Sequence, residues 1–271
     1  GTVTGVQTCA LPISSAASLI TPLIICKDEQ ANIARVLDRL SWANRVLLVD
    51  SGSTDDTLLI ARQFANVDVL HRRFDSFARQ CNFGIAKIQS PWVLSLDADY
   101  VLTSQFVESL ADFAPPDDIW GFRVTLKYCV YGRSLRGTLL PPRICLYRRE
   151  QAEYEDDGHS HHIRPAGRVL DYPAAIYHDD RKPLSRWLWA QDRYMILEVK
   201  KLRETPNSEL TLGDRIRKQK ILAPFIILFY CLILKGGILD GWRGWYYALQ
   251  RMLAETLLSI RLIEAEYSDE T

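Results

Sequence analysis

Short apolar runs alternate with segments of helical spacing along the first hundred residues, and this alternation most constrains the fold. We expect strands where apolar runs are unbroken, and helices where apolar side chains recur every three or four positions. The expected strands are residues 23–26, 45–49, 67–70 and 92–96, and the expected helices are residues 33–40, 58–64 and 74–88. Strands interleaved with helices predict an α/β fold with a Rossmann-like, mostly parallel sheet flanked by helices.

Two of these strands end at an aspartate. Asp50 follows the second strand and Asp97 follows the fourth. Because ligands of parallel α/β sheets bind at the carboxyl ends of the strands, both carboxylates should lie on one rim of the sheet.

The sequence Asp97-Ala98-Asp99 places two carboxylates one residue apart, directly after an apolar strand. Carboxylate and phosphate oxygens are the ligands that Mg²⁺ and Mn²⁺ prefer, and such a metal neutralises a diphosphate leaving group. The alternative is a loop in which the two aspartates occur by chance.

A second polar turn runs from Asp50 through Ser51, Gly52 and Ser53 to Asp55. The Asp50 carboxylate can accept hydrogen bonds from a nucleotide base or ribose, and the small turn residues leave the backbone approachable. The alternative is a simple strand-to-helix turn in which Thr54 or Asp55 caps the following helix.

The second half of the chain divides differently. Residues 119–128 and 143–147 should be strands, possibly antiparallel, and a polar stretch rich in histidine follows at residues 155–162. We expect residues 19–182 to form the catalytic domain and residues 183–271 to form a helical appendage. Residues 1–18 show no periodicity and are expected to be a disordered or non-native arm.

The appendage contains a run of 14 residues without charge, from Ile221 to Leu234. A membrane-spanning helix needs roughly 20 apolar residues, so this run favours a helix that lies in the membrane surface. Aromatic residues flank the run, and basic residues crowd before it, namely Arg215, Arg217, Lys218 and Lys220. The alternative is a helical subdomain or dimer interface that buries the same surface.

Composition adds two expectations. Lys plus Arg and Asp plus Glu both total 33, so no overall field favours nucleic acid as a partner. The six cysteines have no paired spacing, which favours a reducing, cytosolic compartment.

Four segments together resemble the core of a family 2 glycosyltransferase with a GT-A fold. They are PLIICKDEQANI, VLLVDSGSTDDT, FARQCNFGIA and WVLSLDADYVL, in the family's order and spacing over residues 22–110. The later LKGGILDGWRGWYYAL resembles the tail of the subgroup that contains lipopolysaccharide-core glucosyltransferases. The resemblance spans most of residues 20–265.

The resemblance implies a nucleotide-sugar site. Asp50 would contact the base, which we expect to be uracil, and Lys27, Glu29 and Ser51 would line the nucleotide pocket. Arg79 would meet the diphosphate or the donor sugar, unless it only lies on a solvated helix face.

The resemblance also implies a metal site for Mg²⁺ or Mn²⁺. Asp97 would face the ribose or the metal, and Asp99 would bind the metal that bridges the diphosphate. His178 would complete the site, unless it makes a structural hydrogen bond to Asp179 or Asp180.

An inverting enzyme needs a base for the acceptor hydroxyl. Relatives carry a His-Glu pair here; His159 aligns with the histidine, while Ser160 stands in place of the glutamate. We expect Asp157 to be the base, with Asp156 and His159 as rivals.

The sequence thus predicts an inverting, metal-dependent transferase that moves a sugar from a UDP-sugar onto a lipid-linked or lipopolysaccharide-type acceptor. It would work in the cytoplasm, on the inner face of the cell membrane, without nucleic acid. Because Ser160 replaces the glutamate, an inactive nucleotide-binding scaffold on the same fold is the alternative. A nucleotidyltransferase is disfavoured because no glycine-rich phosphate loop follows the first strand.

Overall fold

The computed structural model describes residues 14–157 and 160–268. A seven-stranded sheet forms its centre, in the order β12-β6-β9-β4-β1-β2-β3. Its strands are β1 (Ile20–Cys26), β2 (Val46–Asp50), β3 (Val67–His71), β4 (Trp92–Asp97), β6 (Ile119–Val124), β9 (Arg143–Arg148) and β12 (Arg168–Asp171). The four strands predicted in the first hundred residues are confirmed, and β1, β2, β3 and β4 pair in parallel.

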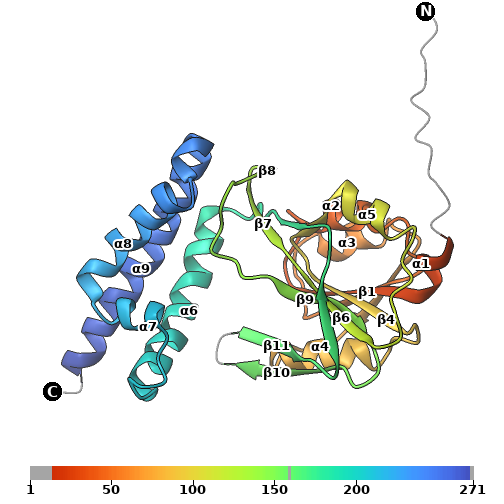
Figure 1. Cartoon of the computed structure of the whole chain (residues 1–271), viewed down its shortest axis with the longest axis horizontal. Helices are drawn as coiled ribbons and strands as arrows, with labels where there is room; N and C mark the ends of the chain where they lie inside the picture. The colour runs from red at the N-terminus through yellow and green to blue at the C-terminus, as the bar shows by residue number, and fades with distance from the viewer. Residues whose placement is uncertain (1–13, 158–159, 269–271) are drawn as a thin grey trace, which may run out of the picture.

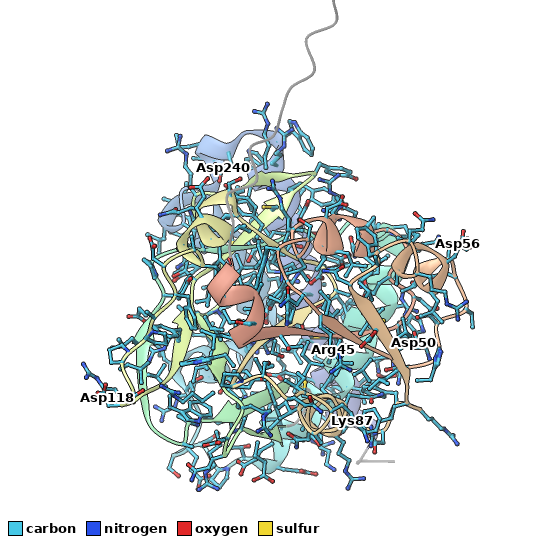
Figure 2. The ribbon with its side chains drawn as sticks, turned by 90° about the vertical axis from the view of Figure 1, so that its right-hand side faces the viewer. Arg45, Asp50, Asp56, Lys87, Asp118 and Asp240 are labelled. Atoms are coloured by element: carbon cyan, nitrogen blue, oxygen red, sulfur yellow. The ribbon has the colours of Figure 1, made fainter. Side chains whose placement is uncertain are left out.

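The sheet is mixed rather than wholly parallel. Strand β9 runs antiparallel to both β4 and β6, as the sequence suggested for this part of the chain. In Figure 2, Asp50 at the end of β2 and Asp118 just before β6 lie on opposite sides of the sheet domain, because β2 and β6 are each the second strand from an edge.

Helices cover both faces because successive strand residues point to opposite sides. On β2, Leu48 packs into a core with α1 (Ser14–Leu19), α2 (Ile33–Asp38), α3 (Thr57–Ala61) and α5 (Ser104–Ser109). Its neighbours Leu47 and Val49 pack on the other face, beneath α4 (Phe77–Ile85). Figure 1 shows α2, α3 and α5 on one side of the sheet and α4 on the other.

The prediction of one continuous strand over residues 119–128 was wrong. It is divided at Thr125 into β6 and β7 (Leu126–Val130), which belong to different sheets. Strand β7 joins β5 (Tyr100–Leu102), β13 (Ile176–His178) and β8 (Arg133–Ser134) in a small sheet of order β5-β13-β7-β8. The polar stretch forms a hairpin of β10 (Glu153–Asp157) and β11 (Ser160–Arg164).

The assigned N-cap of α3 is Asp56, which makes no side-chain cap bond. Asp55 lies one residue earlier, and its side chain accepts a hydrogen bond from the amide of Thr57, the first residue of α3, as expected of a capping aspartate. One other expectation differs from the structure. Residues 14–18, which the sequence suggested as part of a disordered arm, lie in α1, where Ala16 is buried in the core.

The helical appendage begins with α6 (Leu184–Glu204), continues through α7 (Leu212–Arg217) and α8 (Ala223–Phe229), and ends with α9 (Trp242–Ser268). In Figure 1, α6 stands between the sheet domain and α9. Met195 and Val199 of α6 pack against Leu258 and Leu262 of α9. Within the described residues, none of the helices is both long enough and apolar enough to cross a membrane.

Candidate functional site

The carboxyl ends of β2, β1 and β4 lie side by side. Cys26 at the end of β1 is paired with Asp50, and its neighbour Ile25 is paired with Asp97. The predicted common rim is therefore confirmed, with β1 between the two aspartates.

Asp50 organises the turn that follows β2. Its side chain is almost fully buried and accepts hydrogen bonds from the Gly52 amide (2.9 Å), the Ser53 amide (3.1 Å) and the Ser53 hydroxyl. Burial by itself raises the pKa of Asp50, but the hydrogen bonds from Ser53, Gly52 and His71 together lower it. The turn is thus held around an ionised carboxylate, and Gly52 adopts a positive φ of 88° that favours glycine.

Ser51, Lys27 and Glu29 surround this turn. The Ser51 hydroxyl accepts a hydrogen bond from Gln80 of α4 at 2.9 Å, and Lys27 is exposed to solvent. Glu29 lies deeper, where its carboxylate contacts the Lys182 ammonium at 2.7 Å. Burial raises the pKa of Glu29, although Lys182 opposes this effect.

Asp99 and His178 meet beneath the rim. His178 is the last residue of β13, and its Nε2 lies 3.5 Å from Oδ2 of Asp99. The other polar atoms of the pair, Oδ1 of Asp99 and Nδ1 of His178, are buried and have no hydrogen-bond partner. The imidazole lies between the rings of Tyr100 and Tyr128, at centroid distances of 5.4 and 5.1 Å. Its partner is Asp99, not Asp179 or Asp180.

This pair suits a divalent cation. One carboxylate and one imidazole face each other, and each has a buried atom without a hydrogen-bond partner. Among the described residues, no group of three or more His, Cys, Asp or Glu side chains is gathered as a ready metal site. A cation held here would therefore need further oxygen ligands from a diphosphate and from water.

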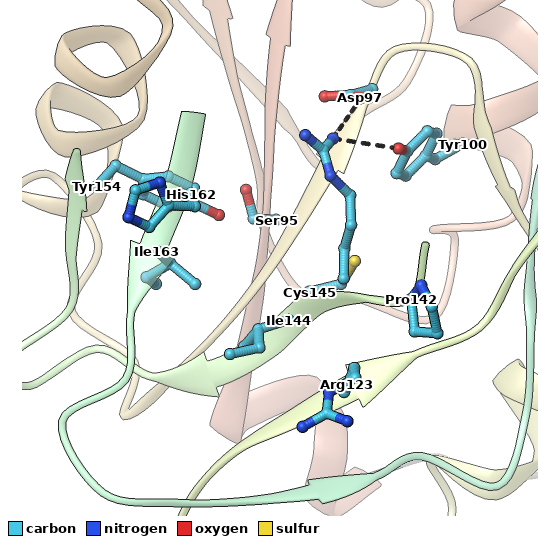
Figure 3. Close-up of a pocket in the computed structure, with 11 residues that line it drawn as sticks. Ser95, Asp97, Tyr100, Arg123, Pro142, Ile144, Cys145, Tyr154, His162 and Ile163 are labelled. Atoms are coloured by element: carbon cyan, nitrogen blue, oxygen red, sulfur yellow. Dashed lines mark hydrogen bonds and ion pairs between the residues drawn. The ribbon is translucent and has the colours of Figure 1, made fainter. Parts of the chain in front are cut away.

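The side chain of Asp97 has a different neighbour. Its Oδ2 lies 3.5 Å from the Arg143 guanidinium, which is also 3.4 Å from the Tyr100 hydroxyl (Figure 3). Sequence reasoning missed Arg143 because it lies within a strand and belongs to no motif. Only the antiparallel pairing of β9 with β4 brings it to Asp97.

Asp97 and Arg143 form one end of a pocket of about 280 Å³. It lies between the sheet and the β10–β11 hairpin, as the close-up in Figure 3 shows. The other lining residues are Ser95, Tyr100, Arg123, Pro142, Ile144, Cys145, Tyr154, His162 and Ile163. A cavity of this size beside the rim can accept a sugar ring.

Two of the candidate bases, Asp156 and Asp157, are the last residues of β10 in the hairpin beside this pocket. Asp156 uses its Oδ1 to accept a hydrogen bond from the Ala78 amide, 3.1 Å away in the first turn of α4. The side chain of Asp157 and the whole of His159 lie outside the described residues. His162, which was not among the expected bases, lines the pocket, and its Nε2 is 3.7 Å from Glu155.

Arg79 is not part of the pocket lining. Its side chain is 72% exposed on α4 and forms an ion pair with Asp75 at 3.6 Å.

A short segment after β13, residues 179–182, ties this site to the start of α2; we call it the strap. Asp179 contacts Arg35 and Arg181, and Asp180 accepts a hydrogen bond from Asn32 at 2.9 Å. Lys182 then reaches Glu29. The strap leads directly into α6, so the appendage is joined to the rim of the sheet.

Comparison with known proteins places this site in context. Residues 22–168 match the family model of glycosyl transferase family 2. The lipopolysaccharide core biosynthesis glycosyltransferase LpsC of Rhizobium meliloti is 24% identical over 233 residues, which cover 83% of each chain. The uncharacterized glycosyltransferase RP128 of Rickettsia prowazekii is 32% identical over 166 residues, 58% of this chain and 56% of that protein.

The fold is similar to that of glucosyl-3-phosphoglycerate synthase from Mycobacterium tuberculosis in complex with phosphoglyceric acid. The TM-score is 0.51 at 18% identity, covering 74% of this chain and 86% of that chain. Another structure of that synthase, with Mn²⁺, UDP and phosphoglyceric acid, aligns with a TM-score of 0.48. The sheet and its helical layers are those of a GT-A fold. Because the family model spans more than half of the chain and includes the whole rim with Asp50, Asp97 and Asp99, the chain belongs to glycosyl transferase family 2.

Proposed function

We propose that this enzyme transfers a sugar from a UDP-sugar, with inversion at the anomeric carbon, onto a lipid-linked or lipopolysaccharide-type acceptor. The observation that carries the proposal is the facing pair of Asp99 and His178, each with an unsatisfied buried atom, beside the Asp50 turn. The acceptor class is supported by the similarity to LpsC, which is named for lipopolysaccharide core biosynthesis.

In this proposal the nucleotide lies along the rim. The Asp50 turn, with Ser51, Lys27 and Glu29, receives the uracil and ribose. Asp97 faces the ribose and donor sugar, since it is already paired with Arg143 on the pocket side. Arg79 would have to leave Asp75 before it could reach the diphosphate.

Asp99 and His178 would hold Mg²⁺ or Mn²⁺, with Asp97 as a further candidate ligand. The cation would neutralise the charge that develops on the diphosphate leaving group. Lys182 would add a further positive charge near Asp99. Its ammonium lowers the pKa of Asp99 and so opposes the effect of burial, and Asp99 in turn raises the pKa of Lys182.

The base would come from the β10–β11 hairpin. It removes the proton of the acceptor hydroxyl while that oxygen attacks the anomeric carbon on the side opposite the diphosphate. The new glycosidic bond forms as the bond to the diphosphate breaks, and UDP leaves. We favour Asp157 over Asp156, because the Asp156 carboxylate already holds the start of α4; His159 is the third candidate.

The appendage would bind the inner face of the cell membrane from the cytoplasm. It contains large apolar side chains that are each more than half exposed: Leu222, Phe225, Phe229, Leu234, Leu239 and Trp242. We call these six residues the apolar face. Attraction to anionic lipid would come mainly from Arg215 and Lys218, because Arg217 and Lys220 are paired with glutamates.

Calorimetric titration with UDP, with and without Mn²⁺, tests the donor site. We expect tight binding that requires the metal and is lost in Asp99→Asn, while the exposed Asp118→Asn serves as the matched control. Metal-independent binding that Asp99→Asn does not change would overturn the metal assignment. UDP binding without any UDP release from UDP-sugars would indicate the inactive scaffold instead.

A further inference from the structure

Arg143 contacts Asp97 where strands β4 and β9 are no longer paired. The two strands pair antiparallel as far as Leu94 and Leu146, and the same register continued along both strands sets Arg143 opposite Asp97. The pocket opens beyond the paired part, where residues of both strands line it: Ser95, Asp97, Arg143, Ile144 and Cys145. The contact of 3.5 Å between Asp97 and Arg143 therefore closes one end of the pocket (Figure 3).

A buried tyrosine holds the guanidinium in place. Nη1 of Arg143, the atom that contacts Asp97, also donates a hydrogen bond of 3.4 Å to the Tyr100 hydroxyl. Tyr100 is 3% exposed, and its place is set by the pairing of β5 with β13, where it lies opposite His178. Its ring lies 5.4 Å from the His178 imidazole. Arg143 is thus anchored on the same tyrosine that packs against the histidine of the expected metal site.

Asp97 and Asp99 lie two residues apart but occupy different places in the site. Asp97, the last residue of β4, lines the pocket together with Ser95. Asp99 follows the strand and faces His178. Within the described part of the chain, Asp97 does not join the Asp99–His178 pair as a third possible metal ligand. Two carboxylates this close would both be attracted to a cation, so a compensating charge on Asp97 leaves Asp99 as the ligand.

The Arg143–Asp97 pair differs from a pair on the edge of the same sheet. Arg168 of the edge strand β12 contacts Asp118 at 2.8 Å, with side chains that are 63% and 59% exposed. Such exposed pairs contribute little to stability and need no further explanation. The side chains of Arg143 and Asp97 are 35% and 37% exposed, and both line the pocket beside the rim. Their pairing is explained by what the rim binds.

We propose that Arg143 is a positioning residue for the donor, which turns the Asp97 carboxylate toward the ribose and away from the cation held by Asp99. An arginine in a protein stays charged, and this one contacts Oδ2 of Asp97, which leaves Oδ1 to accept a hydrogen bond from a ribose hydroxyl. Asp97 is thereby removed from the candidate ligands of the cation. This inference rests on the proposed function, because it assumes that a nucleoside diphosphate binds along the rim.

A double-mutant cycle tests the role, with UDP in Mn²⁺ as the calorimetric probe. Arg143→Met should lower UDP affinity by about 10- to 100-fold, and Arg143→Lys should recover part of it because the charge is kept. Asp97→Asn should lower the affinity as well. In the Asp97→Asn background, Arg143→Met should change the affinity by less than about twofold, because a positioning residue acts only through the carboxylate that it holds.

The requirement for Mn²⁺ separates positioning from metal binding. At saturating UDP, the Mn²⁺ concentration that gives half-maximal binding should be the same in Arg143→Met as in the wild type. His178→Ala should raise it by about tenfold, because it removes an expected ligand. An equal rise in Arg143→Met would mean that Arg143 holds Asp97 as a metal ligand, and this result overturns the inference.

Controls distinguish the remaining outcomes. Arg168→Met is the matched strand arginine and should keep the wild-type UDP affinity. Tyr100→Phe removes only the hydroxyl that anchors the guanidinium, and it should lower UDP affinity by a smaller factor even if Arg143→Met does not fold. A merely structural Arg143 would give a lower unfolding temperature with unchanged UDP affinity.

That result, or equal effects of Arg143→Met in both backgrounds, contradicts positioning through Asp97. In either case the wild type still binds UDP with Mn²⁺ and Asp99→Asn does not, so the proposed donor site stands. A wild type that binds no UDP counts against the donor site as a whole and overturns the role of Arg143 with it.

Discussion

His178 and Asp99 approach within 3.5 Å, although one ends β13 and the other follows β4. If they hold a cation, then His178→Ala should lower UDP affinity in Mn²⁺ by about tenfold or more. The affinity measured in EDTA should not change. A calorimetric comparison in the two buffers checks this, and an equal loss in both buffers would mean that His178 only packs between Tyr100 and Tyr128.

Asp50 should make the protein sensitive to acid. Its pKa is below the ordinary value of 3.8 in the folded state, so its carboxylate stabilises the fold at neutral pH. That contribution is lost as the pH falls through the folded-state pKa. Asp50→Asn should therefore cost about 1–3 kcal/mol at pH 7 and less at low pH.

Urea unfolding at pH 7 and below pH 3 measures the two differences, with Asp118→Asn as the exposed control. An Asp50→Asn variant that loses the same stability at both pH values would show that the ionised form is not what holds the turn.

Substitution of Asp157 should impair catalysis, whereas substitution of Asp156 should mainly lower stability. Asp157→Asn should slow UDP release from the donor by about 10²- to 10⁴-fold while UDP affinity is unchanged. Asp156→Asn should instead lower stability by about 0.5–2 kcal/mol, because its carboxylate holds the Ala78 amide. Steady-state rates and thermal unfolding of both variants test this, and the reversed pattern would identify Asp156 as the base.

Phe229 represents the apolar face in a membrane test. Phe229→Glu should reduce binding to vesicles of phosphatidylethanolamine and phosphatidylglycerol by about tenfold or more, because an exposed apolar ring becomes a charge. The control is Leu59→Glu, which changes an equally exposed apolar residue on α3 of the sheet domain. If neither protein binds vesicles but Phe229→Glu abolishes a dimer, the face joins two copies of the chain.

The rim of the site could be predicted from the sequence because its determinants are local. Asp50 and Asp97 each end an apolar strand, and parallel pairing brings such ends together. The pairing of Asp99 with His178 could be anticipated only from the family resemblance, since a histidine so far along the chain has no local signal.

Other features depend on distant pairing and could not be predicted. Arg143 reaches Asp97 only because β9 runs antiparallel beside β4. Lys182 reaches Glu29 only because the strap lies against the loop between β1 and α2. The break at Thr125 was missed because neither glycine nor proline marks it within an otherwise strand-like run.

Strand β13 has only three residues, yet it is paired on both sides. His178 lies opposite Tyr100 of β5 and Tyr128 of β7. Neighbouring residues of a strand face opposite ways, so a shift of one position would put Tyr177 where His178 now meets Asp99. The length of the connection from β12 to β13 is therefore fixed. Homologous chains that keep the aspartate–histidine pair should tolerate insertions in the long connection between β8 and β9, but none of a single residue between Tyr172 and Ile176.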